Sequence, residues 1–288
     1  MDKRLKGIIA TISSAMFFGL VPLFVKTINA GGGNSVSCAF YRFFLSLLPL
    51  YLIIKYKKIP MKITSEQLAK IILITAFGYG GTAVLLFSSY NFIPSGMATT
   101  IHFTYPVFTI IGCVIFCKAR IKPLKLLCVA LSMTGILLFY DGGAGANTTG
   151  MGIAFLSGIT YAFYIIYLRE SGLQSIPTVK LIFYMNAVAS AMILAMGIVT
   201  DEFTMQLTMK AWIVAGLFAV LASLIGVFGF QIGVRYIGPE NSAILSTLEP
   251  ITSLVIGLLL YGEVFSLRGV IGSICILIST IIVAKMKE

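Results

Sequence analysis

The sequence carries little charge. Only 11% of its 288 residues are Asp, Glu, Lys or Arg, whereas 58% are hydrophobic, and the mean hydropathy is +1.00. A soluble domain carries about 25% charged residues, because its surface must be solvated. This composition excludes a soluble globular fold and predicts that most of the apolar surface faces lipid.

Residues that bind metals or perform catalysis are also scarce. The chain has one histidine and five cysteines, and no two of the cysteines form a CxxC pair. We interpret the cysteines as small buried hydrophobic residues and expect neither a metal nor a cofactor. The glycine-rich segments 31–33 and 142–145 are not followed by Lys-Ser or Lys-Thr, so they do not predict a phosphate-binding loop.

Long apolar runs are the dominant feature of the chain. A membrane helix needs about 20 apolar residues to cross a ~30 Å hydrocarbon core, and its backbone must be hydrogen-bonded internally. The first run is too long for the core of a cleaved leader, so we expect it to stay in the membrane. The sequence predicts an all-α membrane protein with ten transmembrane helices at approximately 6–26, 36–55, 68–90, 95–117, 122–141, 150–169, 177–199, 210–233, 240–261 and 266–285.

The distribution of Lys and Arg predicts the orientation. If the N-terminus is cytoplasmic, 17 of the 21 basic residues fall on the cytoplasmic side and three, Lys26, Lys210 and Arg268, fall outside. Cytoplasmic loops of membrane proteins are rich in Lys and Arg. We therefore expect both termini in the cytoplasm and no nucleic-acid partner, since the membrane topology accounts for the net charge of +11.

The two halves of the chain resemble each other. Residues 93–106 are similar to residues 237–250 at an offset of 144, and 18–26 are similar to 161–169 at an offset of 143. Each half, 1–141 and 150–288, contains five predicted helices. Because five is odd, the second half must enter the membrane from the opposite side, which is the inverted-topology repeat of many secondary transporters.

Several short motifs suggest a family. The first span contains Phe18-Gly19 and ends at Lys26, the second contains Tyr41-Arg42, and Leu248-Glu249-Pro250 precedes Gly262-Glu263. In these motifs the whole chain resembles the ten-helix EamA-type branch of the drug/metabolite transporter superfamily. One departure is Lys118-Ala119-Arg120, where the first repeat should carry a second Gly-Glu. The resemblance implies transport of small metabolites, often export of amino acids or related compounds.

Polar residues within the spans are the candidate site, because ionisable groups are costly in a bilayer. Ser242, Ser246, Glu249 and Ser253 lie on one face of the ninth span. The corresponding face of the fourth span carries Ala98, His102, Tyr105 and Thr109. The predicted substrate-binding residues are Glu249, His102, Ser246, Tyr105, Tyr79, Tyr161, Tyr164, Phe18 and Arg42.

The roles of the ionisable residues leave alternatives open. Glu249 could bind a substrate ammonium or carry a coupling proton, or it could form a structural ion pair. Arg42 could bind a substrate carboxylate, pair with Glu249 or cap backbone carbonyls, and the structural role is favoured because an unpaired buried charge is costly. His102 could handle protons or simply pack as a hydrogen-bonded residue.

Together these features predict a secondary transporter rather than an enzyme. Its partners would be a small-molecule substrate and the lipid bilayer, with transport driven by the substrate gradient or coupled to protons, in a monomer or a homodimer. The short loops and the basic bias suit the cytoplasmic (inner) membrane of a bacterium. An intramembrane enzyme would need a catalytic set, and a channel would more naturally be an oligomer with a ring of polar groups. Both remain alternatives, as does a membrane scaffold without carrier activity.

Overall fold

The protein is helical throughout the part of the chain that the structure describes. In this computed structural model these residues are 2–93, 95–118, 122–138, 147–249, 251–252, 255 and 267–285. They contain no strand. The predicted turns at Arg120 and at Gly262-Glu263, and Pro250 and Ser253 of the predicted polar face, lie outside the described residues.

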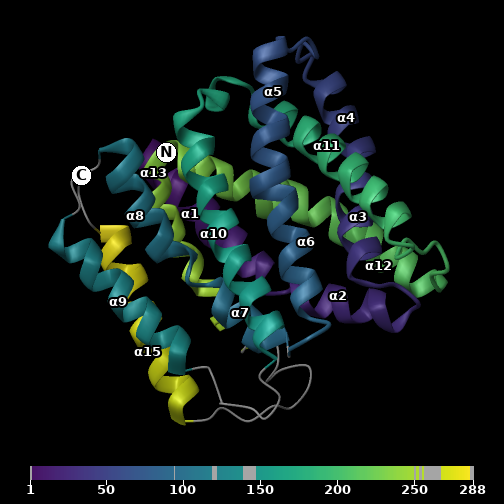
Figure 1. Ribbon diagram of the computed structural model, residues 1–288. Coiled ribbons are helices and arrows are strands. Elements are labelled where there is room, and N and C mark those ends of the chain that lie inside the picture. Colours follow the sequence, from purple (N-terminus) through teal and green to yellow (C-terminus); the bar gives the residue numbers. More distant parts are fainter. Residues whose placement is uncertain are drawn as a thin grey trace.

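Nine α-helices and a short π-helix make up the first half of the described chain (Figure 1). They are α1 (Lys3–Phe18), α2 (Val21–Ala30), α3 (Ser35–Phe44), α4 (Leu47–Tyr56), α5 (Ser65–Ile74), η1 (Thr75–Tyr79), α6 (Gly80–Ser89), α7 (Ser95–His102), α8 (Tyr105–Cys117) and α9 (Pro123–Leu138).

Fewer and longer helices make up the second half. They are α10 (Thr148–Glu170), η2 (Leu173–Ser175), α11 (Thr178–Val199), α12 (Met209–Leu221), η3 (Ala222–Val227), α13 (Phe228–Leu245), η4 (Ser246–Leu248) and α15 (Leu267–Lys285). The N-terminal caps explain several of their starts. Asn147 accepts hydrogen bonds from the backbone of the first turn of α10, and Thr208 caps α12 in the same way.

Six helical runs are long and apolar enough to cross a membrane: 3–30, 35–56, 65–89, 148–170, 178–199 and 209–248. Shorter apolar helices lie at 105–117, 123–138 and 270–283. The structure therefore places helices at the predicted spans wherever their residues are described, while the number of membrane crossings stays a prediction.

Three predicted continuous helices are interrupted, which corrects the sequence interpretation. Breaks separate α1 from α2, α3 from α4, and α7 from α8. Pro22 and Pro106 stand in the first turns of α2 and α8, where a missing N–H costs least. Ser46, at the α3–α4 break, donates a hydrogen bond to the Phe43 carbonyl over 2.7 Å, and such local bonds compete with the helical pattern.

The boundary between the eighth and ninth predicted spans lies within one helical run. Gly238, with φ +82° and ψ 166°, separates residues 228–237 from 239–245 and gives a kink followed by Pro239. Glycine adopts this left-handed conformation without the strain a side chain would add. The kink directs the segment that carries Ser246 and Glu249.

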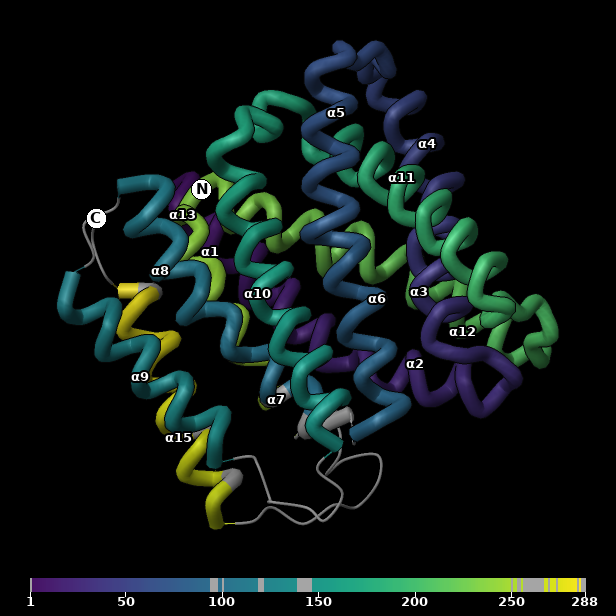
Figure 2. Tube along the Cα trace, viewed as in Figure 1, coloured from purple at the N-terminus to yellow at the C-terminus, as the bar shows by residue number. Residues whose placement is uncertain are grey.

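Close packing joins helices that are far apart in sequence. Helix α1 packs on α13, and α9 lies beside α15 along its whole length (Figure 2). At the α9–α15 contact a Cβ on Gly135 would stand 2.6 Å from the Gly272 carbonyl oxygen. Small residues allow membrane helices to approach this closely. The last described helix therefore packs against the last helix of the first half.

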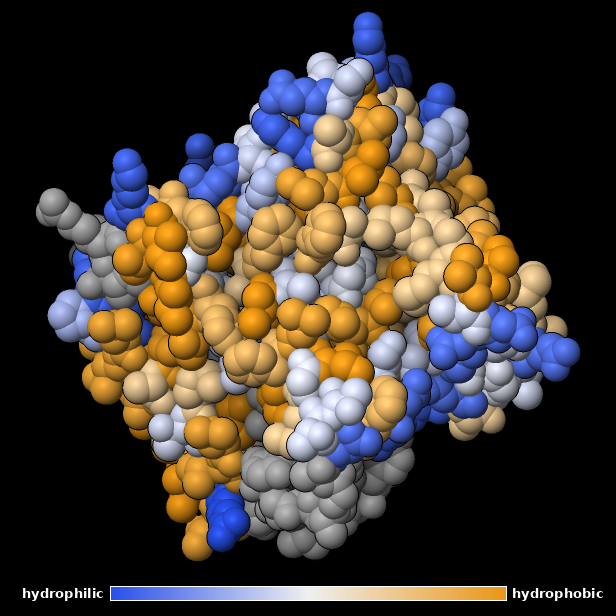
Figure 3. All heavy atoms as spheres, in the orientation of Figure 1, coloured by the Kyte–Doolittle hydropathy of each residue, from blue (hydrophilic) through white to orange (hydrophobic). Residues whose placement is uncertain are grey.

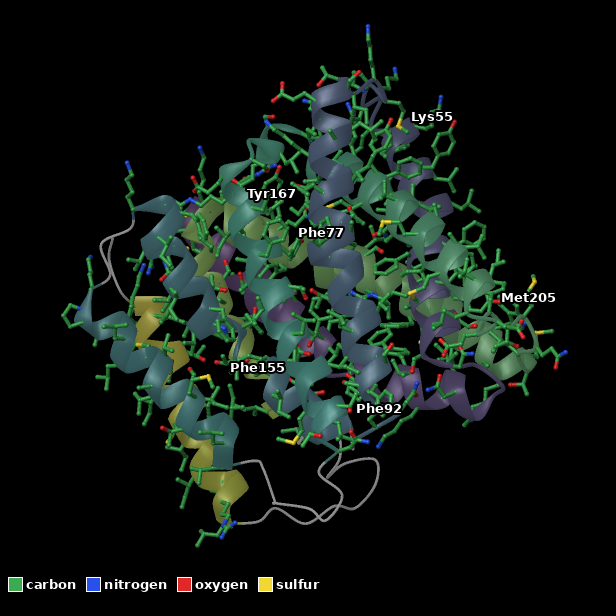
Figure 4. All side chains as sticks on the ribbon, viewed as in Figure 1. Lys55, Phe77, Phe92, Phe155, Tyr167 and Met205 are labelled. Carbon is green, nitrogen blue, oxygen red and sulfur yellow. The ribbon has the colours of Figure 1, made fainter. Side chains whose placement is uncertain are left out.

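On the face shown in Figure 3, apolar side chains cover the middle of the molecule and hydrophilic ones gather toward its edges. Phe77 and Phe155 project outward from the middle of the molecule (Figure 4), with 64% and 44% of their surface exposed. Lys55 lies toward one end and Met205 toward the other. An exposed apolar belt of this kind matches the hydrocarbon core of a bilayer, so the chain is a multi-pass membrane protein.

The two ends of the bundle are closed by contacts between the halves. At one end Lys180 donates to the Lys62 carbonyl over 2.7 Å, and Tyr184 donates to the Met61 carbonyl over 2.5 Å. At the other, the Thr208 amide donates to the Gly31 carbonyl over 2.9 Å. Helix α1 begins and α15 ends at the same end of the molecule (Figure 1).

A polar cavity inside the bundle

A cavity lies among the helices, with about 740 Å³ of space between protein atoms, including its open side. It extends from Tyr79, at the end of η1, along α6 to Tyr90, a rise of about 16 Å at 1.5 Å per residue. Residues of α1, α2, α3, α7, α8, α10, η3 and α13 complete the wall, together with Glu249. Both halves of the chain thus contribute to one internal site.

Eight of the nine residues predicted for the substrate site line this cavity. They are Phe18, Arg42, Tyr79, His102, Tyr105, Tyr161, Tyr164 and Glu249. Ser246 is the exception: it is 4% exposed and does not line the cavity. The helical periodicity placed it on the face of Glu249, but the structure has a tighter 3₁₀ turn over Ser246–Leu248, which changes the direction of its side chain.

The sequence interpretation missed other lining residues. Among them are Pro22, Thr82, Phe87, Tyr90, Thr99 and Phe230. Thr99 lies three residues before His102, so the same helical periodicity could have identified it. Phe230 carried no such signal, because one phenylalanine among 21 is indistinguishable from a packing residue.

Aromatic rings form most of the cavity wall. The Tyr161 ring lies 4.8 Å from that of Tyr105, 5.6 Å from that of Tyr164 and 5.7 Å from that of Phe230, measured between centroids. Tyr79 continues the series at 5.5 Å from Tyr164. Tyrosines present an apolar face with a polar edge, so this wall suits a ligand that is partly apolar and partly polar.

Arg42 brings a positive charge to the cavity from α3. Its guanidinium carbon lies 5.7 Å from the Phe18 ring, 5.2 Å from Phe43 and 5.7 Å from Phe218, within the range of cation–π attraction. Its Nε has no hydrogen-bond partner. None of the salt bridges found between described residues includes Arg42. Arg42 and Glu249 lie within electrostatic range of each other but do not form the ion pair that the sequence left open as one alternative.

Glu249 brings a carboxyl group to the same cavity from the end of the kinked α13 segment. It forms no hydrogen bond or salt bridge within the described part of the chain. Tyr90 and Tyr161 each lie within electrostatic range of both Glu249 and Arg42. The cavity is therefore lined by the Glu249 carboxyl group and the Arg42 guanidinium, which do not contact each other.

His102 lies at the edge of the cavity, 7% exposed. Its Nδ1 is 2.9 Å from the Ser157 hydroxyl of α10, and that hydroxyl donates to the Ala154 carbonyl over 2.6 Å. A nucleophilic serine would have to give its proton to the histidine. In this geometry the Ser157 hydroxyl contacts both the imidazole and a carbonyl of its own helix, and the carbonyl lies closer.

A buried polar network lies at the Tyr79 end of the cavity. The Tyr79 hydroxyl donates to Asn186 Oδ1 over 3.0 Å, and Asn186 Nδ2 donates to the hydroxyls of Ser46, over 2.6 Å, and Ser223, over 3.0 Å. Tyr79 belongs to η1 and Ser223 to η3. The two described π-helical segments, which often mark functional sites, are thus linked through one asparagine.

Comparison with known proteins finds a family and a solved structure with this architecture. A sequence model of the EamA-like transporter family matches the chain twice, at residues 5–141 and 148–285. One solved crystal structure superposes with a TM-score of 0.84 over 97% of this chain and 98% of that one, at 12% sequence identity. At that identity the likeness shows a shared fold.

Three relatives agree with the family match. An uncharacterized transporter of Archaeoglobus fulgidus is 24% identical over 96% of this chain and 95% of its own. The uncharacterized inner membrane transporter YedA of Escherichia coli is 23% identical over 76% of this chain and 71% of its own. Human solute carrier family 35 member G1 is 24% identical over 98% of this chain and 79% of its own.

Proposed function

Because this chain belongs to the EamA-like transporter family and is a membrane transporter, we propose that it is a secondary carrier that exports an amino acid or a related amphipathic metabolite. The observation that carries the substrate class is the cavity itself. It holds one cationic group, Arg42, and one acidic group, Glu249, on an aromatic wall, and the two do not pair with each other.

A zwitterionic substrate satisfies both charges. Its carboxylate pairs with the Arg42 guanidinium, whose planar donors suit a carboxylate, and its ammonium pairs with Glu249. An unpaired charge away from water is costly, so a ligand that neutralises both groups gains more than one that neutralises either alone. The rings of Tyr161 and Phe230 then cover the apolar part of the substrate.

Alternating access is the proposed mechanism. Two EamA repeats in inverted orientation, ten membrane helices in total, would give two related arrangements that open the cavity to opposite sides. The common end of α1 and α15 supports an even number of crossings. Basic residues gather near that end: Lys180 donates to the Lys62 carbonyl, and Arg235 donates to the Ile176 carbonyl. Their positive charge supports a cytoplasmic position for both termini in a bacterial inner membrane.

Proton coupling through Glu249 is the second part of the mechanism. The Glu249 carboxyl can hold either a proton or a substrate ammonium, but not both at once. This competition would couple the substrate gradient to the proton gradient. In export, a proton taken up from outside would displace the substrate ammonium from Glu249. The Glu249 proton would then leave on the cytoplasmic side as the next substrate binds.

Flux measurements test these proposals. The purified protein, reconstituted in liposomes, would be given a radiolabelled mixture of the standard amino acids with and without a pH gradient. We expect saturable flux that unlabelled substrate competes away. Glu249→Gln should lower the flux at least tenfold and remove its dependence on the gradient, whereas Glu66→Gln, at an exposed residue, should change neither.

Arg42→Gln provides the complementary measurement. Loss of a partner from a desolvated charge pair typically costs a few kcal/mol, so the KM for a zwitterion should rise about 10- to 100-fold. The KM for the corresponding amine, which lacks the carboxylate, should change little. Equal effects on both compounds would show that Arg42 is structural.

A further inference from the structure

The hydrogen bonds around His102 determine which of its nitrogens carries the proton. A serine hydroxyl has one proton to donate, and that of Ser157 goes to the Ala154 carbonyl over 2.6 Å. At the 2.9 Å contact with His102 the Ser157 oxygen must therefore accept, so Nδ1 of the imidazole is the donor. In a neutral imidazole the other nitrogen, Nε2, is then an acceptor.

The Nε2 edge is the part of His102 that reaches the cavity. The Nδ1 edge is turned to Ser157 on α10, and His102 lines the cavity. The imidazole stands against Tyr105 and Tyr161, with a centroid distance of 5.4 Å to each ring. Within the described chain Nε2 forms no hydrogen bond, which leaves a buried acceptor available to a ligand.

A second acceptor lies across the same two tyrosines. Tyr105 and Tyr161 are both within electrostatic range of the Glu249 carboxylate. Glu249, when ionised, and His102 Nε2 thus line one cavity and both offer acceptors. A ligand group that satisfies both must carry at least two N–H bonds, and next to a carboxylate a positive charge is favoured. A primary ammonium meets both conditions, whereas a trimethylammonium meets only the second.

We propose that His102, held by Ser157 with its proton on Nδ1, accepts an N–H hydrogen bond from the substrate ammonium beside Glu249, and that this bond makes the carrier select primary ammonium compounds over their fully N-methylated analogues. The inference rests on the proposed function, since it concerns the same cavity. Ser157 acts as a positioning residue, because it touches the imidazole and not the substrate. A site built to donate or accept a hydrogen bond rejects an analogue that leaves its group unpaired.

Competition in proteoliposomes tests the inference. The probe is the labelled amino acid with the largest saturable flux, and the competitors are the same amino acid unlabelled and its N,N,N-trimethyl derivative. For the unchanged protein we expect half-inhibition by the trimethyl compound at a concentration at least tenfold higher. In His102→Phe the KM of the amino acid should rise about tenfold, inhibition by the trimethyl compound should stay the same, and the discrimination should disappear.

Conservative variants separate hydrogen bonding from packing. His102→Gln keeps an acceptor and should keep part of the discrimination. Ser157→Ala removes the group that holds the Nδ1 proton and should also reduce it. Ser190→Ala is the matched control, because Ser190 is a buried serine on α11 that donates to the carbonyl three residues before it, over 3.0 Å, and does not line the cavity. It should leave the discrimination unchanged.

The outcomes distinguish the inference from the proposed function. If His102→Phe folds, transports the amino acid and still rejects the trimethyl compound tenfold, then the size of the cavity sets the selectivity and the role of His102 is wrong, while the carrier function stands. If Ser157→Ala behaves like Ser190→Ala in every measurement, the positioning role is wrong. Absence of saturable flux in the unchanged protein would overturn the proposed function together with this inference.

Discussion

Replacement of Asn186 by leucine tests whether the buried network beneath the cavity stabilises the fold. Asn186 is fully buried and makes three side-chain hydrogen bonds, with Tyr79, Ser46 and Ser223. A hydrogen bond contributes about 0.5–1.5 kcal/mol net, and a buried group left without a partner costs about 1–3 kcal/mol. The loss depends on which of the three partners can be satisfied elsewhere.

In Asn186→Leu only one of the three partners, Ser223, is left without a hydrogen bond. Ser46 still donates to the Phe43 carbonyl, and the Tyr79 hydroxyl also lies beside the Arg42 side chain. Ser223 is 2% exposed and loses its partner outright. We therefore expect Asn186→Leu to lower the free energy of unfolding by about 2–4 kcal/mol, which corresponds to about two orders of magnitude in the unfolding equilibrium constant.

Unfolding by SDS in mixed micelles, followed by helical circular dichroism, measures this free energy. Asn186→Leu with Tyr79→Phe should cost about 1 kcal/mol less than the sum of the single variants, because the Tyr79–Asn186 bond can be lost only once. A single variant within about 0.5 kcal/mol of the unchanged protein, or strictly additive costs, would refute the reasoning.

Two further predictions concern packing and charge. Gly233→Ala should destabilise the protein by about 1–3 kcal/mol, because the added Cβ would stand 1.9 Å from Thr11 Oγ1. Gly216→Ala is the control, because a Cβ added there meets no neighbouring atom within 4 Å; it should be neutral or slightly stabilising in the same unfolding assay. Glu240→Gln should cost about 3 kcal/mol by leaving the partly buried Lys125 unpaired, since the two charges lie 3.8 Å apart. Lys125→Met added to it should recover part of that loss, and no recovery would show that the pair is not coupled.

The membrane helices were predictable from the sequence, and their interruptions were not. Apolar length is imposed by the bilayer and can be read locally, so spans such as 35–56 and 178–199 lie close to their predicted ranges. The breaks at Ser46 and Gly238, and the π-helical segments η1 and η3, depend on contacts with other helices. No local propensity encodes those contacts.

The candidate site shows the same division. Ionisable side chains are costly to insert in a bilayer, so the sequence alone identified Glu249, Arg42 and His102 as candidates. The relation between them was not predictable, because it depends on which helices pack together: the structure leaves the Arg42 guanidinium among aromatic rings without a salt bridge. Ser157 gave no signal at all, although its hydroxyl lies 2.9 Å from His102 Nδ1.

The sequence by itself therefore determined the environment of the chain, its helical class and its two related halves, because the bilayer demands long apolar helices and a repeat persists as a pattern along the chain. Only the tertiary structure decided which side chains share the cavity and which pair with each other. Asn186 and Ser46, 140 residues apart, lie 2.6 Å from each other. Such a contact arises from the packing of whole helices, since neither residue's neighbours in the sequence specify it.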